Sequence, residues 1–153
     1  MRLRVIAVGT RIPSWARSAC AEYLQRLRLP VELVEIETAG RRQSDLQRAV
    51  AREAERLLAL LTARDYVVSL DERGRELTTS ELAAWLGQRM QHGADLAFLI
   101  GGPDGLAPAV LARSNLTLAL SRLTLPHALA RVLLSEQLYR AHSILVNHPY
   151  HRD

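Results

Sequence analysis

Three short segments of the sequence combine residue types that bind small molecules. They are residues 70–74, 100–105 and 120–127, and each begins at the end of a run with the composition of a β-strand. In open α/β sheets, ligands bind beyond the carboxyl ends of the strands. We therefore expect a ligand site among these three segments.

The second segment reads Ile100-Gly101-Gly102-Pro103-Asp104-Gly105. Glycine lets a ligand approach main-chain N–H and C=O groups closely, so this segment suits main-chain recognition of a small molecule. A tight turn between a strand and a helix is the alternative, and for a lone Gly-Gly pair it is the more common one. The spacing disfavours a Rossmann dinucleotide site, and the absence of lysine excludes a P-loop.

The third segment places Leu123, Thr124 and Leu125 between a strand and a helix that begins at Pro126. Polar turn residues are usual in such a place. These residues either pack internally or line a pocket for a flat aromatic ligand such as adenine. The sequence leaves both interpretations open.

The chain ends in Tyr150, His151, Arg152 and Asp153. This tail combines an aromatic ring, an imidazole that titrates near neutral pH and a guanidinium that binds phosphate. It is either a solvated tail or a segment that folds over a substrate. Cys20 and Trp15, in contrast, are expected to be packing residues.

Composition restricts the class of protein. Hydrophobic residues make up 48% and charged residues 24% of the 153 residues, which is typical of a globular protein of one domain. A single cysteine excludes an internal disulfide and a multi-cysteine zinc site, and no apolar run reaches the roughly 20 residues that span a bilayer. We expect a soluble cytoplasmic protein without a bound metal.

The net charge is +4, and all 20 basic residues are arginine. Guanidinium groups bind phosphate with two hydrogen bonds and stack on bases, so RNA or DNA is a plausible partner. A GC-rich genome explains the same bias without any such partner.

The chain alternates β-rich runs with longer amphipathic segments, which predicts one α/β domain with a parallel sheet covered on both faces. Strands are expected at residues 3–8, 31–37, 66–70, 96–100 and 116–120, and a turn at 71–76. Helices are expected at residues 14–28, 44–61, 78–92, 107–113 and 126–145. Thr78 and Glu81 have the spacing of a capping box, and Pro126 is expected at a first helical position.

The last expected helix carries leucines on more than one face. Besides the sheet, it could therefore pack against a second subunit, which predicts a dimer. Glu136 and Arg140 have the i,i+4 spacing of a helical ion pair.

Together, six segments of this chain resemble the RlmH family, the large-subunit ribosomal RNA methyltransferases H, which are minimal SPOUT or α/β-knot methyltransferases. The matching segments are Val5-Ile6-Ala7-Val8-Gly9-Thr10, Leu70-Asp71-Glu72-Arg73-Gly74, Ile100-Gly101-Gly102-Pro103-Asp104-Gly105, Leu123-Thr124-Leu125-Pro126-His127, Glu136-Gln137-Leu138-Tyr139-Arg140-Ala141 and Asn147-His148-Pro149-Tyr150-His151-Arg152. Their order and the length of the chain make the resemblance specific.

The resemblance implies S-adenosylmethionine-dependent methylation at N3 of a pseudouridine in 23S rRNA, with the assembled ribosome as substrate. It also implies a homodimer, a C-terminal trefoil knot, and a single SPOUT domain over residues 1–153 without a separate RNA-binding domain.

The resemblance further implies which residues form the site. The residues expected to enclose S-adenosylmethionine are Leu70, Gly101, Leu120, Ser121, Arg122, Leu123, Thr124 and Leu125, with His127 bordering the same pocket. The Arg122 side chain is expected to point outward, towards RNA. Tyr150, His151 and Arg152 look like RNA-binding or catalytic residues that are supplied across the dimer interface.

His151 is the first candidate to accept the N3 proton, and Tyr150 would stack on or orient the flipped nucleotide. Alternatively, Arg152 stabilises the anionic base while solvent takes the proton. The candidate phosphate-binding side chains are Arg2, Arg4, Arg11, Arg122, Arg131, Arg140 and Arg152. Two other classes remain open: a flavodoxin-like enzyme with a phosphorylated cofactor at Gly101-Gly102, and a non-catalytic ribosome-binding factor.

Overall fold

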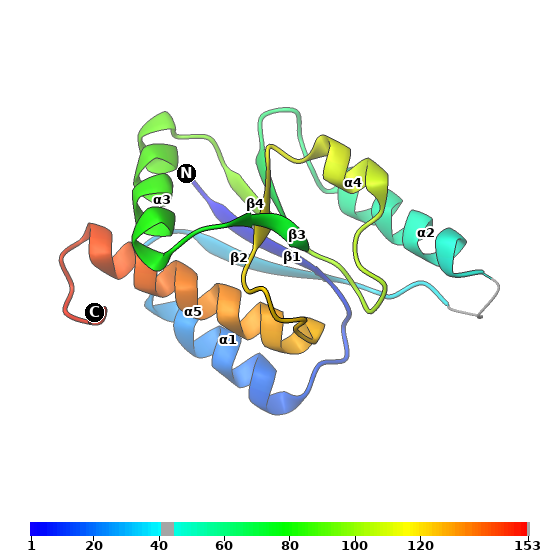
Figure 1. Cartoon of the computed structure of the whole chain (residues 1–153), viewed down its shortest axis with the longest axis horizontal. Helices are drawn as coiled ribbons and strands as arrows, with labels where there is room; N and C mark the ends of the chain where they lie inside the picture. The colour runs from blue at the N-terminus through cyan, green and yellow to red at the C-terminus, as the bar shows by residue number, and fades with distance from the viewer. Residues whose placement is uncertain (41–44, 153) are drawn as a thin grey trace.

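Strands and helices alternate along the whole chain in the computed structural model, which describes residues 1–40 and 45–152 (Figure 1). In the described residues the strands are β1 (Leu3–Val8), β2 (Val31–Ile36), β3 (Tyr66–Glu76), β4 (Leu96–Ile100) and β5 (Leu116–Ala119). The helices are α1 (Ser14–Arg26), α2 (Leu46–Ala59), α3 (Thr79–His92), α4 (Pro108–Arg113) and α5 (His127–Leu145).

The five strands form one sheet in the order β2-β1-β4-β3-β5, and all of its neighbouring strands are parallel. Every residue of β1 and of β4 is buried. Parallel strands with helices on both faces read as continuous apolar runs, which is why 96–100 was recognisable as a central strand. The predicted α/β fold with a parallel sheet is confirmed.

Helices cover the two faces of this sheet in two groups. On one face, Val5 of β1 belongs to a core that includes Leu86 of α3 and Leu138 of α5. On the other face, Ile6 of β1 belongs to a second core that includes Leu57 of α2 and Val110 of α4. In Figure 1, α1 and α5 run side by side on the first face, while α2 and α4 lie together on the second.

The expected turn at residues 71–76 is wrong, because β3 continues to Glu76. The register between β3 and β5 shifts between Leu70 and Arg75, as in a β-bulge. A Cβ atom on Gly74 would lie 2.7 Å from the Thr117 carbonyl oxygen, so the two strands approach closely at a position that needs glycine.

The residues predicted to begin helices agree better with the structure than the predicted turn does. Thr78 and Glu81 form the predicted capping box, with Glu81 N–H donating to Thr78 Oγ1 at 3.1 Å. Pro126 is the N-cap of α5 and not its first helical residue. The predicted start of the second helix at Ser44 lies outside the described residues.

The packing prediction for α1 is half right. Cys20 is fully buried, as expected, but the Trp15 residue is 56% exposed. Trp15 therefore lies on the outer face of α1, and its side chain does not join the core. Among the described residues, no helix is long and apolar enough to cross a membrane, and no group of three or more His, Cys, Asp or Glu side chains is placed to bind a metal ion.

Candidate functional site

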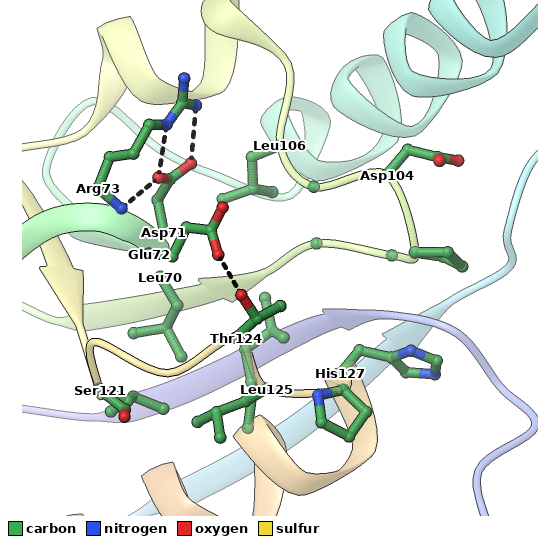
Figure 2. A pocket seen from close by; sticks show the side chains of 18 of the residues that line it. Leu70, Asp71, Glu72, Arg73, Asp104, Leu106, Ser121, Thr124, Leu125 and His127 are labelled. Atoms are coloured by element: carbon green, nitrogen blue, oxygen red, sulfur yellow. Dashed lines mark hydrogen bonds and ion pairs between the residues drawn. The ribbon is translucent and has the colours of Figure 1, made fainter.

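A cavity of about 840 Å³ lies at the carboxyl ends of β4 and β5, beside the middle of β3 and the start of α5. Its walls come from the three segments that the sequence singled out. The predicted cofactor residues that line it are Leu70, Gly101, Leu120, Ser121, Leu123, Thr124, Leu125 and His127. Figure 2 shows Leu70, Ser121, Leu125 and His127 around one hollow. The sheet therefore brings together residues that are up to 57 positions apart in the sequence (127 − 70).

The glycine-rich segment forms one wall as a tight turn. Gly105 has a φ of +77°, and its N–H donates to the Gly102 carbonyl at 3.1 Å. A Cβ atom on Gly101 would lie 2.7 Å from the main-chain carbon of Gly105. Glycine is therefore required here for the turn itself, and the turn places bare main chain along the cavity.

The segment after β5 forms the opposite wall. Ser121 Oγ accepts a hydrogen bond from Leu123 N–H at 2.9 Å, which holds the bend. Thr124 Oγ1 donates to Glu72 Oε2 at 3.1 Å and so ties the segment to β3 (Figure 2). Leu123 is 74% exposed. Of the two interpretations of this segment, the structure therefore shows the one in which it lines a pocket.

Arg122 is the one predicted cofactor residue outside the cavity lining. Its side chain is 86% exposed, and its Nε atom lies 3.7 Å from Glu76 Oε1. This placement agrees with the expectation that the Arg122 side chain points outward.

The sequence analysis identified the 70–74 segment but predicted only Leu70 as a cofactor residue. It therefore missed the polar lining residues that follow Leu70. Asp71, Glu72 and Arg73 also line the cavity. Arg73 donates to both Asp71 oxygens, from Nε at 3.1 Å and from Nη2 at 3.2 Å. This hydrogen bonding outweighs the effect of burial and lowers the pKa of Asp71. The signal was available, because Asp71, Glu72 and Arg73 are polar residues that follow directly after a buried run.

Tyr150, His151 and Arg152, the described residues of the C-terminal tail, lie outside this cavity in their own chain. Tyr150 Oη donates to Glu136 Oε1 at 3.0 Å, and the Tyr150 ring centroid lies 4.6 Å from that of Tyr139. Arg140 Nη1 lies 3.3 Å from His151 Nδ1. Burial and the bond to Glu136 raise the pKa of Tyr150 well above its ordinary value. Tyr150 and His151 therefore pack against α5 and are not simply solvated.

The distance between tail and cavity follows from the helix that joins them. Glu136 lies nine residues after His127, which borders the cavity, and this corresponds to about 13 Å along an α-helix. None of Tyr150, His151 and Arg152 belongs to the cavity lining. The structure therefore does not bring the predicted catalytic residues and the predicted cofactor residues together within one subunit.

The prediction of phosphate binding is wrong for two of the seven candidate arginines, because their side chains are buried. Arg4 is 8% exposed and pairs with Asp65, from Nη2 to Oδ2 at 2.7 Å. Arg131 is 1% exposed and pairs with Glu35, from Nη1 to Oε2 at 2.5 Å. A cation buried in this way needs its partner inside the protein and cannot meet a phosphate. Arg2, Arg11, Arg122 and Arg152 are exposed, and Arg140 is partly buried against Glu136.

Comparison with known sequences gives one consistent result. The family described as "Predicted SPOUT methyltransferase" matches residues 1–151. The chain is 49% identical over 157 aligned positions to the ribosomal RNA large subunit methyltransferase H of Burkholderia mallei (strain SAVP1), with 99% of each chain covered. The protein of the same name from Burkholderia pseudomallei (strain 668) matches equally well.

Solved structures share the fold. A probable methylase family protein from Haemophilus influenzae Rd KW20 has a TM-score of 0.57 at 18% identity, covering 99% of this chain and 70% of its own. A putative methylase family protein from Neisseria gonorrhoeae has a TM-score of 0.57 at 17% identity, covering 99% of this chain and 86% of its own.

Proposed function

The chain belongs to the SPOUT methyltransferases and, within them, to the RlmH family, and from this we propose that it methylates the RNA of the large ribosomal subunit with S-adenosylmethionine as donor. Relatives that match over 99% of both chains carry that activity in their names. The cavity at the carboxyl ends of β4 and β5 is the observation in this structure that carries the proposal.

The residues present fit S-adenosylmethionine. When bound, this donor supplies a methyl group on a positively charged sulfonium. The cavity volume, about 840 Å³, lies within the range of small-molecule sites, roughly 300–1,000 Å³. Leucine side chains suit the faces of an adenine ring, and the bare Gly101 main chain suits its polar edge. Arg73 neutralises Asp71 within the lining, and the carboxylate of Glu72 favours a cationic ligand.

Each wall has a separate task in this proposal. Leu70, Leu120 and Leu125 enclose the adenine, and the turn from Gly101 to Gly105 provides main-chain hydrogen-bonding groups. Ser121, Leu123 and Thr124 complete the wall opposite the turn. His127 borders the cavity at the start of α5. Arg122 faces away from the cavity, where its guanidinium is available to RNA.

We further propose the finer specificity that the family resemblance implies. The target is N3 of a pseudouridine in 23S rRNA within the assembled ribosome, in the cytoplasm, where ribosomes are found. Residues 1–153 form one SPOUT domain with a C-terminal trefoil knot, and the working unit is a homodimer. The separation of tail and cavity supports the dimer, because a second subunit would have to bring Tyr150, His151 and Arg152 to the donor.

The tail residues have defined tasks in this proposal. Tyr150 orients the flipped nucleotide, Arg152 stabilises negative charge on the base, and His151 accepts the N3 proton. The arginine in the Arg140–His151 pair can only donate, so His151 Nδ1 is the acceptor there. Nδ1 can accept the N3 proton only after its hydrogen bond from Arg140 is broken and the substrate base takes the place of Arg140.

A transfer assay tests the proposed function. The purified protein is incubated with tritiated S-adenosylmethionine and with intact ribosomes, free large subunits or naked 23S rRNA. We expect label in 23S rRNA, most efficiently from intact ribosomes. Efficient labelling of naked rRNA would contradict the ribosome requirement, and no labelling of any substrate would contradict the methyltransferase.

Calorimetry tests the first of the two remaining classes, and the transfer assay tests the second. A flavodoxin-like enzyme would bind flavin mononucleotide and not S-adenosylmethionine, whereas we expect the reverse. A non-catalytic ribosome-binding factor would bind ribosomes without transferring label.

A further inference from the structure

A second cavity, of about 410 Å³, lies beside the first. Its walls come from the end of β1 and the loop after it, with Val8, Gly9, Thr10 and Arg11, and from the loop after β2, with Glu37 and Thr38. Pro103 and His127 line this cavity and also the first one. The two cavities therefore meet at these two residues.

The border between the two cavities matters because methyl transfer needs the donor and the acceptor to lie side by side. An in-line methyl transfer requires the nucleophile to sit about 3–3.5 Å from the methyl carbon. A nucleotide site must therefore open directly onto the donor site. The second cavity borders the donor cavity at Pro103 and His127, which line both, and so lies where such a nucleotide site is needed.

The lining of the second cavity is mostly polar, unlike the leucine-rich wall of the first. Thr10 and Thr38 contribute hydroxyls, which both donate and accept hydrogen bonds. Glu37 contributes a carboxylate, which accepts from N–H groups, and the exposed Arg11 contributes a guanidinium, which binds phosphate. A pseudouridine nucleotide, the uracil-class target proposed above, carries the matching groups: two carbonyls, a phosphate and a ring N1–H that can donate to Glu37 while N3 reacts.

We propose that this second cavity receives the target nucleotide, a uracil-class base that has been flipped out of the RNA, with Glu37 and Thr38 binding the base and Arg11 its phosphate. The proposal rests on the methyltransferase function proposed above and assigns its nucleotide subsite.

The floor of the cavity is held by an ion-pair network that runs from the buried Arg131 to the exposed Arg17. Arg131 of α5 donates from Nη2 to the Gly9 carbonyl at 3.1 Å, and Arg17 of α1 donates from Nη2 to the Thr10 carbonyl at 3.0 Å. Both arginines also bind the same carboxylate, Glu35 of β2. Three elements therefore fix two consecutive carbonyls of the loop after β1.

The geometry of that loop requires this support. Gly9 has a φ of +121°, and its N–H donates to the Ile36 carbonyl at 2.8 Å. On the other wall, Arg56 of α2 donates from Nη1 to the Glu37 carbonyl at 2.8 Å. These hydrogen bonds fix both walls, as expected of a preorganised binding site.

Two substitutions in the full-length protein test the proposal. Glu37→Gln removes the carboxylate without changing its size, and Thr38→Phe fills the cavity. Neither residue lines the donor cavity. Glu55→Gln, on the exposed side of α2, makes the same charge change elsewhere and serves as the control.

We expect kcat/KM for methylation of ribosomes to fall at least about tenfold in both cavity variants, while the Kd for S-adenosylmethionine stays within about twofold of wild type. Glu55→Gln should retain wild-type values of both. Thermal unfolding of each variant confirms that it is folded.

The outcomes are distinguishable. Wild-type kcat/KM in both cavity variants would overturn the nucleotide site and leave the methyltransferase intact. A parallel loss of S-adenosylmethionine binding in folded variants would overturn the assignment of the cavity to the nucleotide. A wild-type protein that transfers no methyl group to ribosomes would overturn the proposed function itself, and the nucleotide site with it.

Discussion

Gly101 shows how one residue type can set the shape of a ligand site. Its main chain passes so close to Gly105 that even a methyl group at Cα would lie 2.7 Å from another backbone atom. Backbone cannot move aside as the end of a flexible side chain can. Because Gly101, Gly102 and Gly105 have no side chains, they line the cavity with main chain alone, which is what recognition of a ligand by N–H and C=O groups needs.

Replacing Gly101 by alanine should therefore displace this turn. We expect the Kd for S-adenosylmethionine, measured by calorimetry, to rise at least about tenfold, which corresponds to 1.4 kcal/mol. Gly40→Ala is the matched control, because a Cβ atom there has no neighbour within 4 Å among the described residues. An unchanged Kd in folded Gly101→Ala would contradict the role of the turn.

His151 differs from the cavity residues because its proposed task concerns only the transfer step. Replacing His151 by alanine should lower kcat by about 10²–10⁴-fold, the usual contribution of a general base, and leave the Kd for S-adenosylmethionine unchanged. His92→Ala, at the exposed end of α3, should have no effect on either quantity. Full activity of His151→Ala would remove this residue from the mechanism.

At the scale of the elements, the Glu35 carboxylate joins α1, β2 and α5. Burial alone would raise the pKa of Glu35, but hydrogen bonds from Arg17 and Arg131 outweigh it and bring the pKa below its ordinary value of 4.5. The carboxylate is therefore more stable as an anion in the folded protein than in the unfolded chain.

Glu35→Gln should destabilise the protein by about 3 kcal/mol, because it leaves the buried Arg131 without its counter-charge. Chemical denaturation at neutral pH measures this free energy of unfolding. The control is Glu22→Gln, which breaks an exposed i,i+4 pair with Arg26 and should cost at most about 0.5 kcal/mol. Equal effects of the two substitutions would contradict a structural role for the network.

The same network predicts that the free energy of unfolding depends on pH. A carboxyl group whose pKa is lowered by folding contributes stability above its unfolded pKa and loses it as the pH falls through the folded value. The difference in unfolding free energy between wild type and Glu35→Gln should therefore be constant at neutral pH and shrink below pH 4.5. Denaturation curves from pH 7 downwards measure it, and a difference that grows on acidification would refute the assignment.

At the scale of the whole molecule, the central feature is the separation of tail and cavity. Tyr150 and His151 are held near Glu136 and Arg140, whereas α5 meets the cavity at His127. If the tail acts on the donor bound to the other subunit, two different defects can complement each other within one dimer.

Mixing subunits tests this arrangement. His151→Ala supplies an intact cavity with a defective tail, and Gly101→Ala supplies the opposite. With random exchange, half of the dimers are mixed and each contains one complete site, so about a quarter of wild-type methylation should return. Each variant incubated alone is the control. No recovery after exchange, verified by mass spectrometry, would show that the tail acts within its own subunit.

Much of the fold and of the first cavity was predictable because the signals are local. Continuous apolar runs marked the buried strands, and Thr78 with Glu81 marked the start of α3. The three polar or glycine-rich segments followed directly from the ends of these runs. Eight of the nine residues predicted for the cofactor line one cavity, since the parallel sheet brings the carboxyl ends of β4 and β5 beside Leu70 in the middle of β3.

The remaining features depend on partners far away in the chain, and periodicity does not encode them. Arg4 and Arg131 look like surface arginines until Asp65 and Glu35, 61 and 96 residues away, neutralise them inside the protein. Likewise, β3 continues past residue 70 because β5 pairs with it there. Sequence by itself determined the order of the elements and the residue types at the strand ends. Tertiary structure decided which charges are buried, how far the tail lies from the cavity and where a second cavity opens. Burial and distance are set by contacts between distant segments, and only folding brings those segments together.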